Sequence, residues 1–541
     1  MSQVSGNIVD IIKKTISPGV IEIKDGTICS ITPVEDNYQT YIIPGFIDSH
    51  IHIESSMLTP SEFARAAVVH GTVGAVCDPH EIANVLGVEG VRYMIDDGGR
   101  VPFKFSWGVP SCVPATAYET SGAKLGIAEV ETLLKTKDGH FLSEVMNVPG
   151  VLNDDPEVIG KINLAKSYNK VVDGHAPNLG GKELEKYISY GISTDHECIT
   201  ESEALEKLQL GMKVLIREGS AAKNFNDLIS VAKVYPDDCM FCSDDKHPDD
   251  LRLGHINAMI KKAVRYGLEV MDVLRIATLN PIKHYNLDVG LLREGDPADF
   301  LVIDNLFDFN ILKTFINGSL VAENGTTLIK AQSKKIVNNF NVREKDIDEF
   351  SLKNKNREVN VIRAIDGQLI TERLQEEPKV VKGFLVSDPD RDILKIAVID
   401  RYEDRPPSIA FVKNFGLKEG AIGSSVAHDS HNIVAVGVDD NDLCEVINLI
   451  IKNRGGIGAV CGEREKILPL PIAGIMSDLS SEEVAQRYTD IDMFAKELGS
   501  ALRSPFMTLS FMALLVIPEI KLSDKGLFDG KNFSFIDLYS C

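Results

Sequence analysis

The 541-residue sequence has no apolar run long enough to span a bilayer. Its longest apolar stretch, residues 505–518, covers about 14 residues and is interrupted by Thr508 and Ser510, whereas a membrane helix needs roughly 20 residues. The sequence also lacks an excess of positive charge, because 57 lysines and arginines stand against 79 aspartates and glutamates, a net charge of −22. Nucleic-acid backbones and anionic membranes would repel such a chain, so neither is expected as its main partner.

Cysteine is sparse as well. The nine cysteines are odd in number, and most of them follow apolar, strand-like residues, as Cys77 and Cys461 do. Residues 1–15 contain acids and lysines and no apolar core of the secretory type. These features predict reduced core thiols and a cytoplasmic protein. The composition, 44% apolar and 25% charged, excludes wholesale disorder, and the length favours more than one domain.

Eight short apolar runs, separated by helix-like stretches, lie in the middle of the chain. They cover residues 42–47, 72–77, 103–109, 141–146, 171–172, 191–194, 213–216 and 239–242. Eightfold alternation of strand and helix predicts an α/β fold of the (β/α)8 barrel type, because a doubly wound sheet usually has fewer strands.

Two β-rich segments flank this middle part. Their short apolar runs are turned at Asp-Gly and Asn-Gly pairs, which are typical of hairpins. We therefore expect a small satellite β-sandwich built from residues 1–43 and 289–339, on either side of a barrel at residues 44–288. Residues 340–378 are charged and poor in aromatics, which predicts a linker or surface helix, and the alternating runs that follow predict an α+β domain within residues 340–541.

Histidines and carboxylates recur where the predicted barrel strands end. In this fold the active site lies at the C-terminal ends of the strands. The residues found there are Asp48, His50, His52, Asp78, His80, Glu81, Glu144, Asn147, Asp173, His175, Asp195, His196, Glu197, Asp244 and Asp245.

His50 and His52 are spaced i, i+2, so they point to the same side of a strand and can reach one cation. Twelve histidines in a chain of this length supply about 0.27 such pairs by chance. The pair alone therefore leaves a polar strand end, hydrogen-bonded to backbone, as an equal alternative.

Four further residues strengthen the metal hypothesis. Glu144 stands inside an apolar run, where a carboxylate is costly unless it is paired or binds a metal, and Asp244 follows a similar run. His175 and His196 end consecutive candidate strands. Four histidines and two carboxylates together predict a two-metal site. Imidazole and carboxylate ligands without thiolate fit Zn, Mn or Fe.

Residues 44–52, Pro-Gly-Phe-Ile-Asp-Ser-His-Ile-His, resemble the first-strand motif of the metal-dependent amidohydrolase superfamily. Other segments are similar to those of one branch, the bacterial-type adenine deaminases: residues 51–57, 78–84, 144–151, 173–177, 194–197, 295–299 and 423–432. This resemblance covers nearly the whole chain.

The resemblance implies a binuclear centre, with Mn²⁺ favoured and Fe²⁺ or Zn²⁺ as alternatives. Its implied ligands are His50, His52, Glu144, His175, His196 and Asp244. Glu144 would bridge the two ions, where many superfamily members use a carboxylated lysine. Asp244 and Glu144 would be the catalytic residues, with Asp244 taking the proton of the attacking water.

The implied reaction is hydrolysis of adenine to hypoxanthine and ammonia in purine salvage, by a homo-oligomer, most simply a dimer. His80, Glu81 and His428 are the candidate substrate-binding residues. For His80 and Glu81, a role in holding a loop is an equal alternative. The segment from His428 to His431 is either a mobile lid over the barrel or a structural turn.

Two other functions stay open at this point. One is another cyclic amide or amidine hydrolase of the same superfamily, such as a guanine deaminase or a dihydropyrimidinase-like enzyme, although the second and fourth strand-end motifs fit these less well. The other is a non-catalytic assembly protein on the same fold, which would be expected to have lost metal ligands.

Overall fold

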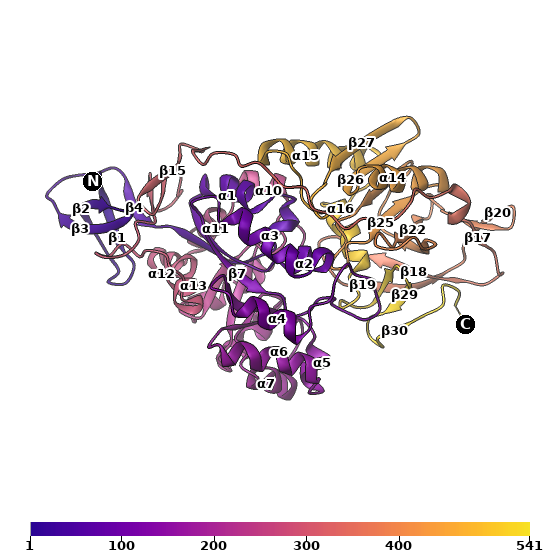
Figure 1. Cartoon of the computed structure of the whole chain (residues 1–541), viewed down its shortest axis with the longest axis horizontal. Helices are drawn as coiled ribbons and strands as arrows, with labels where there is room; N and C mark the ends of the chain where they lie inside the picture. The colour runs from indigo at the N-terminus through magenta and orange to yellow at the C-terminus, as the bar shows by residue number, and fades with distance from the viewer. Residues whose placement is uncertain (1, 541) are drawn as a thin grey trace.

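The computed structural model describes residues 2–540, which form a central barrel with a sheet at one end and a larger α+β part at the other (Figure 1). The barrel strands are β5 (Phe46–Ile51), β6 (Thr72–Cys77), β7 (Lys104–Val109), β8 (Gly139–Val145), β9 (Val172–Gly174), β10 (Thr194–Asp195), β11 (Lys213–Arg217) and β12 (Cys239–Cys242). Strands β5–β9 form one parallel sheet and β10–β12 another. Parallel bridges between Val172 and Ile192 and between Ile51 and Asp244 join the two sheets. The predicted eight-stranded barrel is confirmed.

Helices follow most barrel strands and cover the outside of the barrel (Figure 1). They include α1 (Pro60–Val68), α2 (His80–Leu86), α3 (Val88–Gly98), α4 (Ile127–Leu134), α6 (Pro156–Ser167), α7 (Gly181–Ser189), α8 (Glu201–Gln209) and α11 (Ile256–Tyr266). In α11 the buried residues are spaced three and four apart, which places one apolar face on the barrel wall.

The strand expected at residues 42–47 is in fact two strands. Residues Tyr41–Pro44 form β4 of the satellite sheet, and β5 of the barrel begins at Phe46. Gly45 lies between them, at a point where an added Cβ would stand 2.4 Å from both Cγ atoms of Val73. Only glycine allows this close approach, so the chain passes from one sheet to the other in a single residue.

The satellite unit is built from both flanks of the barrel, as expected; its strands belong to one hydrogen-bonded sheet, in which a further isolated bridge joins Thr27 to Pro297. Its strands, in spatial order, are β16 (Thr326–Thr327), β15 (Ser319–Glu323), β14 (Ile311–Ile316), β13 (Phe300–Ile303), β4, β1 (Ser2–Asp10), β2 (Thr15–Lys24) and β3 (Thr27–Pro33). Strand β4 pairs with β1 on one side and with β13 on the other. It therefore joins the N-terminal and C-terminal halves into one hydrogen-bonded sheet.

The C-terminal part has the expected α+β composition. Its main sheet has the order β19 (Thr371–Glu376), β18 (Val359–Ala364), β23 (Ser408–Lys413), β22 (Ile393–Ile399), β25 (Ile433–Gly437), β24 (Ala421–Ser424), β26 (Gly456–Cys461) and β27 (Arg464–Pro469). Helices α14 (Asp440–Lys452) and α15 (Ser481–Glu497) pack on this sheet.

The linker or surface helix expected at residues 340–378 is wrong. This segment supplies two strands of the sheet, β18 and β19, and β18 buries Val359, Val361 and Ile362. Strand β18 pairs with β19 on one edge and β23 on the other. The charged residues of segment 340–378 are mostly exposed. The short apolar run of β18 lies between them and is buried by pairing with its neighbouring strands.

The apolar stretch at residues 505–518 contains helix α16 (Pro505–Ser510) and the 3-10 helix η4 (Phe511–Ala513). No helix within residues 2–540 is long and apolar enough to cross a membrane. After η4 the chain continues into β28 (Ile520–Ser523) and β29 (Gly526–Asp529). This stretch lies over the mouth of the barrel, where it takes part in the site described next.

Candidate active site

The six predicted metal ligands converge at the C-terminal ends of five barrel strands, β5, β8, β9, β10 and β12. All are buried, with exposed fractions of 2–9%: His50, His52, Glu144, His175, His196 and Asp244. Subsets of their nitrogen and oxygen atoms lie within 4.8 Å of one another. Burying so many ionisable groups is costly unless they bind one another or a cation.

Glu144 lies at the centre of the cluster. Its Oε2 is 2.8 Å from Nδ1 of His175 and 3.3 Å from Nε2 of His196, and its Oε1 is 3.3 Å from Nε2 of His52. Burial would raise the pKa of Glu144, but these imidazoles outweigh burial and hold it well below its usual range. The ionised carboxylate therefore has one oxygen facing His52 and the other facing His175 and His196.

His50 and His52 turn the same ring atoms toward each other. Their Nε2 atoms are 3.2 Å apart, and they lie 3.5 and 3.2 Å from Oδ1 of Asp244. Burial, together with the imidazole of His196, lowers the pKa of His50, which favours the neutral form that binds metals. Two nitrogens and a carboxylate oxygen that converge in this way fit a divalent cation as a shared partner.

Asp244 is held in place from two sides. Its amide N–H donates to the carbonyl of His50 at 2.9 Å, and its own carbonyl accepts from the amide of His52. The φ angle of 53° places it in the left-handed region, which aspartate tolerates better than most residues. Arg217, on β11, pairs with both Asp244 and Glu197.

The charge state of Asp244 follows from these contacts. Burial would raise its pKa, but the Arg217 guanidinium and the imidazoles of His50 and His52 hold it well below its usual range. Asp244 is therefore a carboxylate that can accept a proton, and it lies beside the predicted metal ligands.

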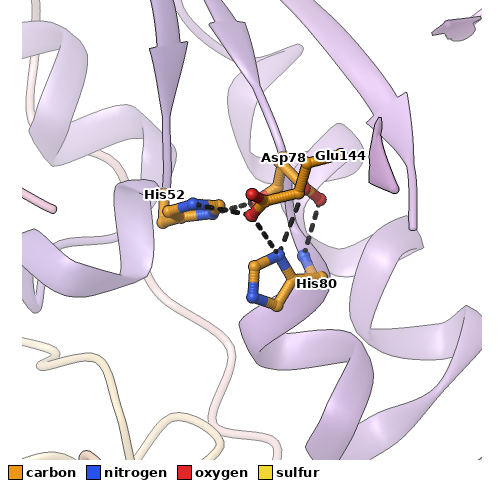
Figure 2. A group of neighbouring side chains, drawn as sticks. All are labelled: His52, Asp78, His80 and Glu144. Atoms are coloured by element: carbon orange, nitrogen blue, oxygen red, sulfur yellow. Dashed lines mark hydrogen bonds and ion pairs between the residues drawn. The ribbon is translucent and has the colours of Figure 1, made fainter. Parts of the chain in front are cut away.

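His80 begins helix α2 and reaches the cluster from the end of β6. Its Nδ1 lies 3.1 Å from Oδ2 of Asp78 and 3.5 Å from Oε1 of Glu144. Figure 2 shows the Glu144 carboxylate between the imidazoles of His52 and His80. Burial would lower the pKa of His80, but Asp78 and Glu81 outweigh it and raise the pKa well above the usual value. His80 is thus a buried proton donor.

The C-terminal domain supplies a second pair of imidazoles. The loop between β24 and β25 places Nδ1 of His428 against Oε1 of Glu81, and Nε2 of His431 lies 2.5 Å from Oε2. In the same loop, Asp429 Oδ1 is 3.7 Å from Nε2 of His80. The loop is therefore more than a turn of its own domain, because it contacts the barrel mouth. We call the residues that meet there the polar wall: His80, Glu81, His428, Asp429 and His431.

Opposite charges fix the protonation of this wall. Burial would raise the pKa of Glu81, but His428 and His431 outweigh it and hold it well below its usual range. Burial would lower the pKa of His428, yet Glu81 and Asp245 raise it to about 9. At neutral pH the wall presents an ionised Glu81 and a cationic His428.

A small cavity of about 40 Å³ lies directly over the cluster. On its far side it is closed by four apolar residues of the C-terminal domain: Leu369, Phe511, Leu514 and Val516. We call these four residues the roof. Small-molecule sites usually measure about 300–1,000 Å³, so the free volume over the cluster is small.

Sequence reasoning missed several residues of this site. Arg217 closes the apolar run of the seventh strand, and its charge at that position was a usable signal. Glu197 directly follows His196 and was named only as a strand-end residue. Asp429 and His431 belong to the segment expected as a lid or a turn, but no local signal identified their partners, which lie some 350 residues earlier.

Comparison with known proteins gives two family matches. Residues 41–321 match the amidohydrolase family, and residues 368–534 match the adenine deaminase C-terminal domain. An adenine deaminase of Sulfurovum sp. (strain NBC37-1) is 54% identical over 536 residues, and one of Salinibacter ruber is 52% identical over 538 residues. The alignments cover 99% of this chain and 99% and 98% of the two relatives. Among solved structures, a β-aspartyl dipeptidase of Fervidobacterium islandicum AW-1 aligns with 60% of this chain and 96% of its own, with 16% identity and a TM-score of 0.45.

Proposed function

The chain belongs to the adenine deaminase family, and on that premise we propose that its buried cluster converts adenine and water to hypoxanthine and ammonia. The observation that supports this best is the convergence of all six expected ligands under a roof supplied by the C-terminal domain. A complete ligand set argues against an assembly protein that has lost catalysis. The C-terminal domain match argues against a guanine deaminase or a dihydropyrimidinase-like enzyme. A role in purine salvage follows from the product.

The cluster fits two divalent cations, and we propose Mn²⁺ for both, with Fe²⁺ or Zn²⁺ as alternatives. His50 and His52 would hold one ion and His175 and His196 the other, with Glu144 between them. Bound there, such cations would lower the pKa of water and supply hydroxide near neutral pH. Asp244 completes the ligand set, since its Oδ1 faces both His50 and His52.

Asp244 moves the proton in this proposal. As an ionised carboxylate it accepts the proton of the water that attacks C6 of adenine, and then donates it to the departing amine. Arg217 binds Oδ2 of Asp244 and the carboxylate of Glu197, so Oδ1 is the oxygen that faces His50 and His52. Bond formation at C6 and loss of ammonia balance without any further reactant.

The polar wall stabilises the purine ring. Attack at C6 moves negative charge onto a ring nitrogen, which must then receive a proton or a hydrogen bond. Cationic His80, beside Glu144, is the donor that we propose for this nitrogen, and it regains a proton when the hydroxyl added at C6 loses its own to form the carbonyl of hypoxanthine. Glu81 accepts from an N–H of the base and is fixed in turn by His428.

The assay that tests this function uses metal-free protein reconstituted separately with Mn²⁺, Fe²⁺ and Zn²⁺. Ammonia release from adenine is expected with at least one metal, together with hypoxanthine as the second product. Inactivity on adenine with every metal, combined with activity on guanine or dihydrouracil, would overturn the proposal in favour of another amidohydrolase.

We further propose a cytoplasmic homodimer. The eight cysteines of residues 2–540 are all free thiols, and six of them are buried, which supports a reducing compartment. The dimer is implied by the family resemblance, and light scattering of the purified protein would test it.

A further inference from the structure

Two separate segments of the C-terminal domain form the roof. Leu369 lies in the connection between β18 and β19, whereas Phe511, Leu514 and Val516 lie in and after η4. The segments are about 140 residues apart in sequence. Backbone hydrogen bonds of Thr371 with Pro518 and Glu519 join the chain just beyond the two segments, but neither segment itself belongs to a long helix or to the central strands of the sheet.

Lys521 connects these two segments. It lies on β28 and is fully buried, with an exposed fraction of 0%. Its Nζ donates to the carbonyl of Leu369 at 2.6 Å and to the carbonyl of Phe511 at 2.9 Å. One amine therefore joins the backbone of both roof segments, directly behind the side chains that face the cavity.

The environment of Lys521 is unusual for a lysine. Burial lowers its pKa to about 7, and no carboxylate within residues 2–540 offsets this shift. Burying an amine without a counter-ion is costly. An apolar side chain of similar length would avoid that cost, but it would leave the two carbonyls without their donor. The role of Lys521 is therefore to donate to the two carbonyls, and not only to fill space.

The roof also contacts the polar wall. The ring of Phe511 stacks on the imidazole of His428, with centroids 5.1 Å apart and an interplanar angle of 27°. His428 in turn pairs with Glu81. The position of Phe511 thus affects both the apolar and the polar side of the cavity.

We propose that Lys521 is a positioning residue for adenine deamination, which holds Leu369 and Phe511 against the purine by binding their carbonyls. This inference rests on the proposed function, because it assumes that the purine lies in the cavity between the cluster and the roof. Lys521 does not itself line the cavity. It acts through the two residues that it binds, in the ground state and in the transition state alike.

The test compares the manganese-loaded full-length protein with its K521M, F511A and K521M/F511A variants, by ammonia release from adenine. Uniform binding of ground and transition state predicts a KM at least about tenfold higher for K521M, with kcat changed less than about threefold. F511A should raise KM in the same way. If Lys521 acts through Phe511, the double variant should be little worse than the worse single variant.

Lys395 offers a matched control. It is also a lysine of this domain with an exposed fraction of 1%, and its Nζ binds the carbonyl of Phe350 and the carboxylate of Asp440, away from the roof. K395M should lower the melting temperature and leave KM unchanged. A wild-type KM in K521M, or effects of K521M and F511A that add in full, would overturn the proposal, because only the share that acts through Leu369 should persist when Phe511 is replaced.

If K521M does not fold, K521Q can replace it, because glutamine keeps a hydrogen-bond donor on a shorter side chain. In K521Q, hydrogen exchange at residues 367–371 and 509–515 should be faster than in the wild type. Unchanged exchange together with unchanged KM would count against a positioning role. If the wild type itself releases no ammonia from adenine with any metal, the proposed function fails, whatever the variants do.

Discussion

Glu81 and His431 lie 350 residues apart in the sequence, yet Oε2 of one is 2.5 Å from Nε2 of the other. His428 takes the other carboxylate oxygen. The barrel therefore supplies the Glu81 carboxylate, and the C-terminal domain supplies the two imidazoles that hold it in position. The polar wall thus requires both domains, and the barrel alone could not form it.

Glu81→Gln should remove the charge that both histidines bind while leaving the six metal ligands in place. We expect kcat/KM for adenine to fall by about 10²–10⁴, the range of general acid–base and charge-assisted contacts. His431→Gln should cost less, about tenfold, because His428 still holds Glu81. Ammonia release measures both effects, with metal content checked on the same samples.

His247 provides the control for these variants. It forms another contact between the domains, since its Nδ1 is 2.6 Å from the hydroxyl of Tyr488 on α15, but it does not line the cavity. His247→Gln should leave kcat/KM near the wild-type value. Equal losses in His247→Gln and Glu81→Gln would mean that loss of domain contact, and not loss of the polar wall, reduces activity.

Asp244→Asn keeps the shape of the side chain and removes its ability to take a proton. We expect kcat to fall by about 10²–10⁴ while the protein still binds metal, because the proton of water then lacks an acceptor. Single-turnover ammonia release, together with metal analysis, makes the measurement. Near-normal turnover by metal-loaded Asp244→Asn would exclude Asp244 as the base.

Local periodicity explains why the barrel and most of its ligands could be predicted. Most barrel strands lie in short apolar runs, and the fold brings the ends of such runs together, so His50, Glu144 and His196 could be assigned to one site. Long-range pairing leaves no such mark. The charged segment that contains β18 has its partners on distant strands, and the loop at His431 finds its acid in another domain.

Metal removal should affect both activity and stability. Since the cluster is buried and composed of imidazoles and carboxylates, metal binding favours the folded state, by about 2.7 kcal/mol at a free concentration of 100 times Kd. Chelation should therefore abolish ammonia release and lower the melting temperature, and readdition of Mn²⁺ should restore both.

Metal stoichiometry tests the bridging position of Glu144. The wild type should contain two ions per chain. Glu144→Ala should retain less than one, because its oxygens face both pairs of histidines, whereas His50→Ala should retain about one. Equal retention in the two variants, measured by elemental analysis, would contradict a bridging carboxylate.

The roof predicts selection of the free base over the nucleoside. With C6 at the metal cluster, the opposite edge of the purine would meet apolar residues such as Leu514, which offer no hydrogen-bond partner to a ribose at N9. We expect kcat/KM for adenosine to be at least about 100-fold below that for adenine. Leu514→Ala should bring the kcat/KM values for adenine and adenosine closer together. Comparable turnover of both substrates by the wild type would contradict a purine bound with C6 at the metal cluster and N9 at the roof.

A buried ion pair on the barrel should contribute strongly to the free energy of unfolding. Lys207 and Asp195 are both fully buried, with Nζ 2.9 Å from the carboxylate, and Nζ also donates to the carbonyl of Ala176 at 2.6 Å. Lys207→Met leaves the charge of Asp195 buried and unpaired, so it should reduce the free energy of unfolding by about 3–5 kcal/mol. Chemical denaturation of metal-loaded protein measures the loss.

The pH dependence of this contribution has a defined sign. Burial would raise the pKa of Asp195, but Lys207 and the imidazole of His196 outweigh burial and lower the pKa below its ordinary value. Because the pKa is lower in the folded state, the stabilisation is fully present above about pH 4 and is lost as the pH falls below that value. The stability difference between the wild type and Lys207→Met should therefore shrink in acid. Lys186→Met, which removes an exposed pair with Asp154, should show no resolvable difference at any pH, and a similar loss there would attribute the effect to lysine removal in general.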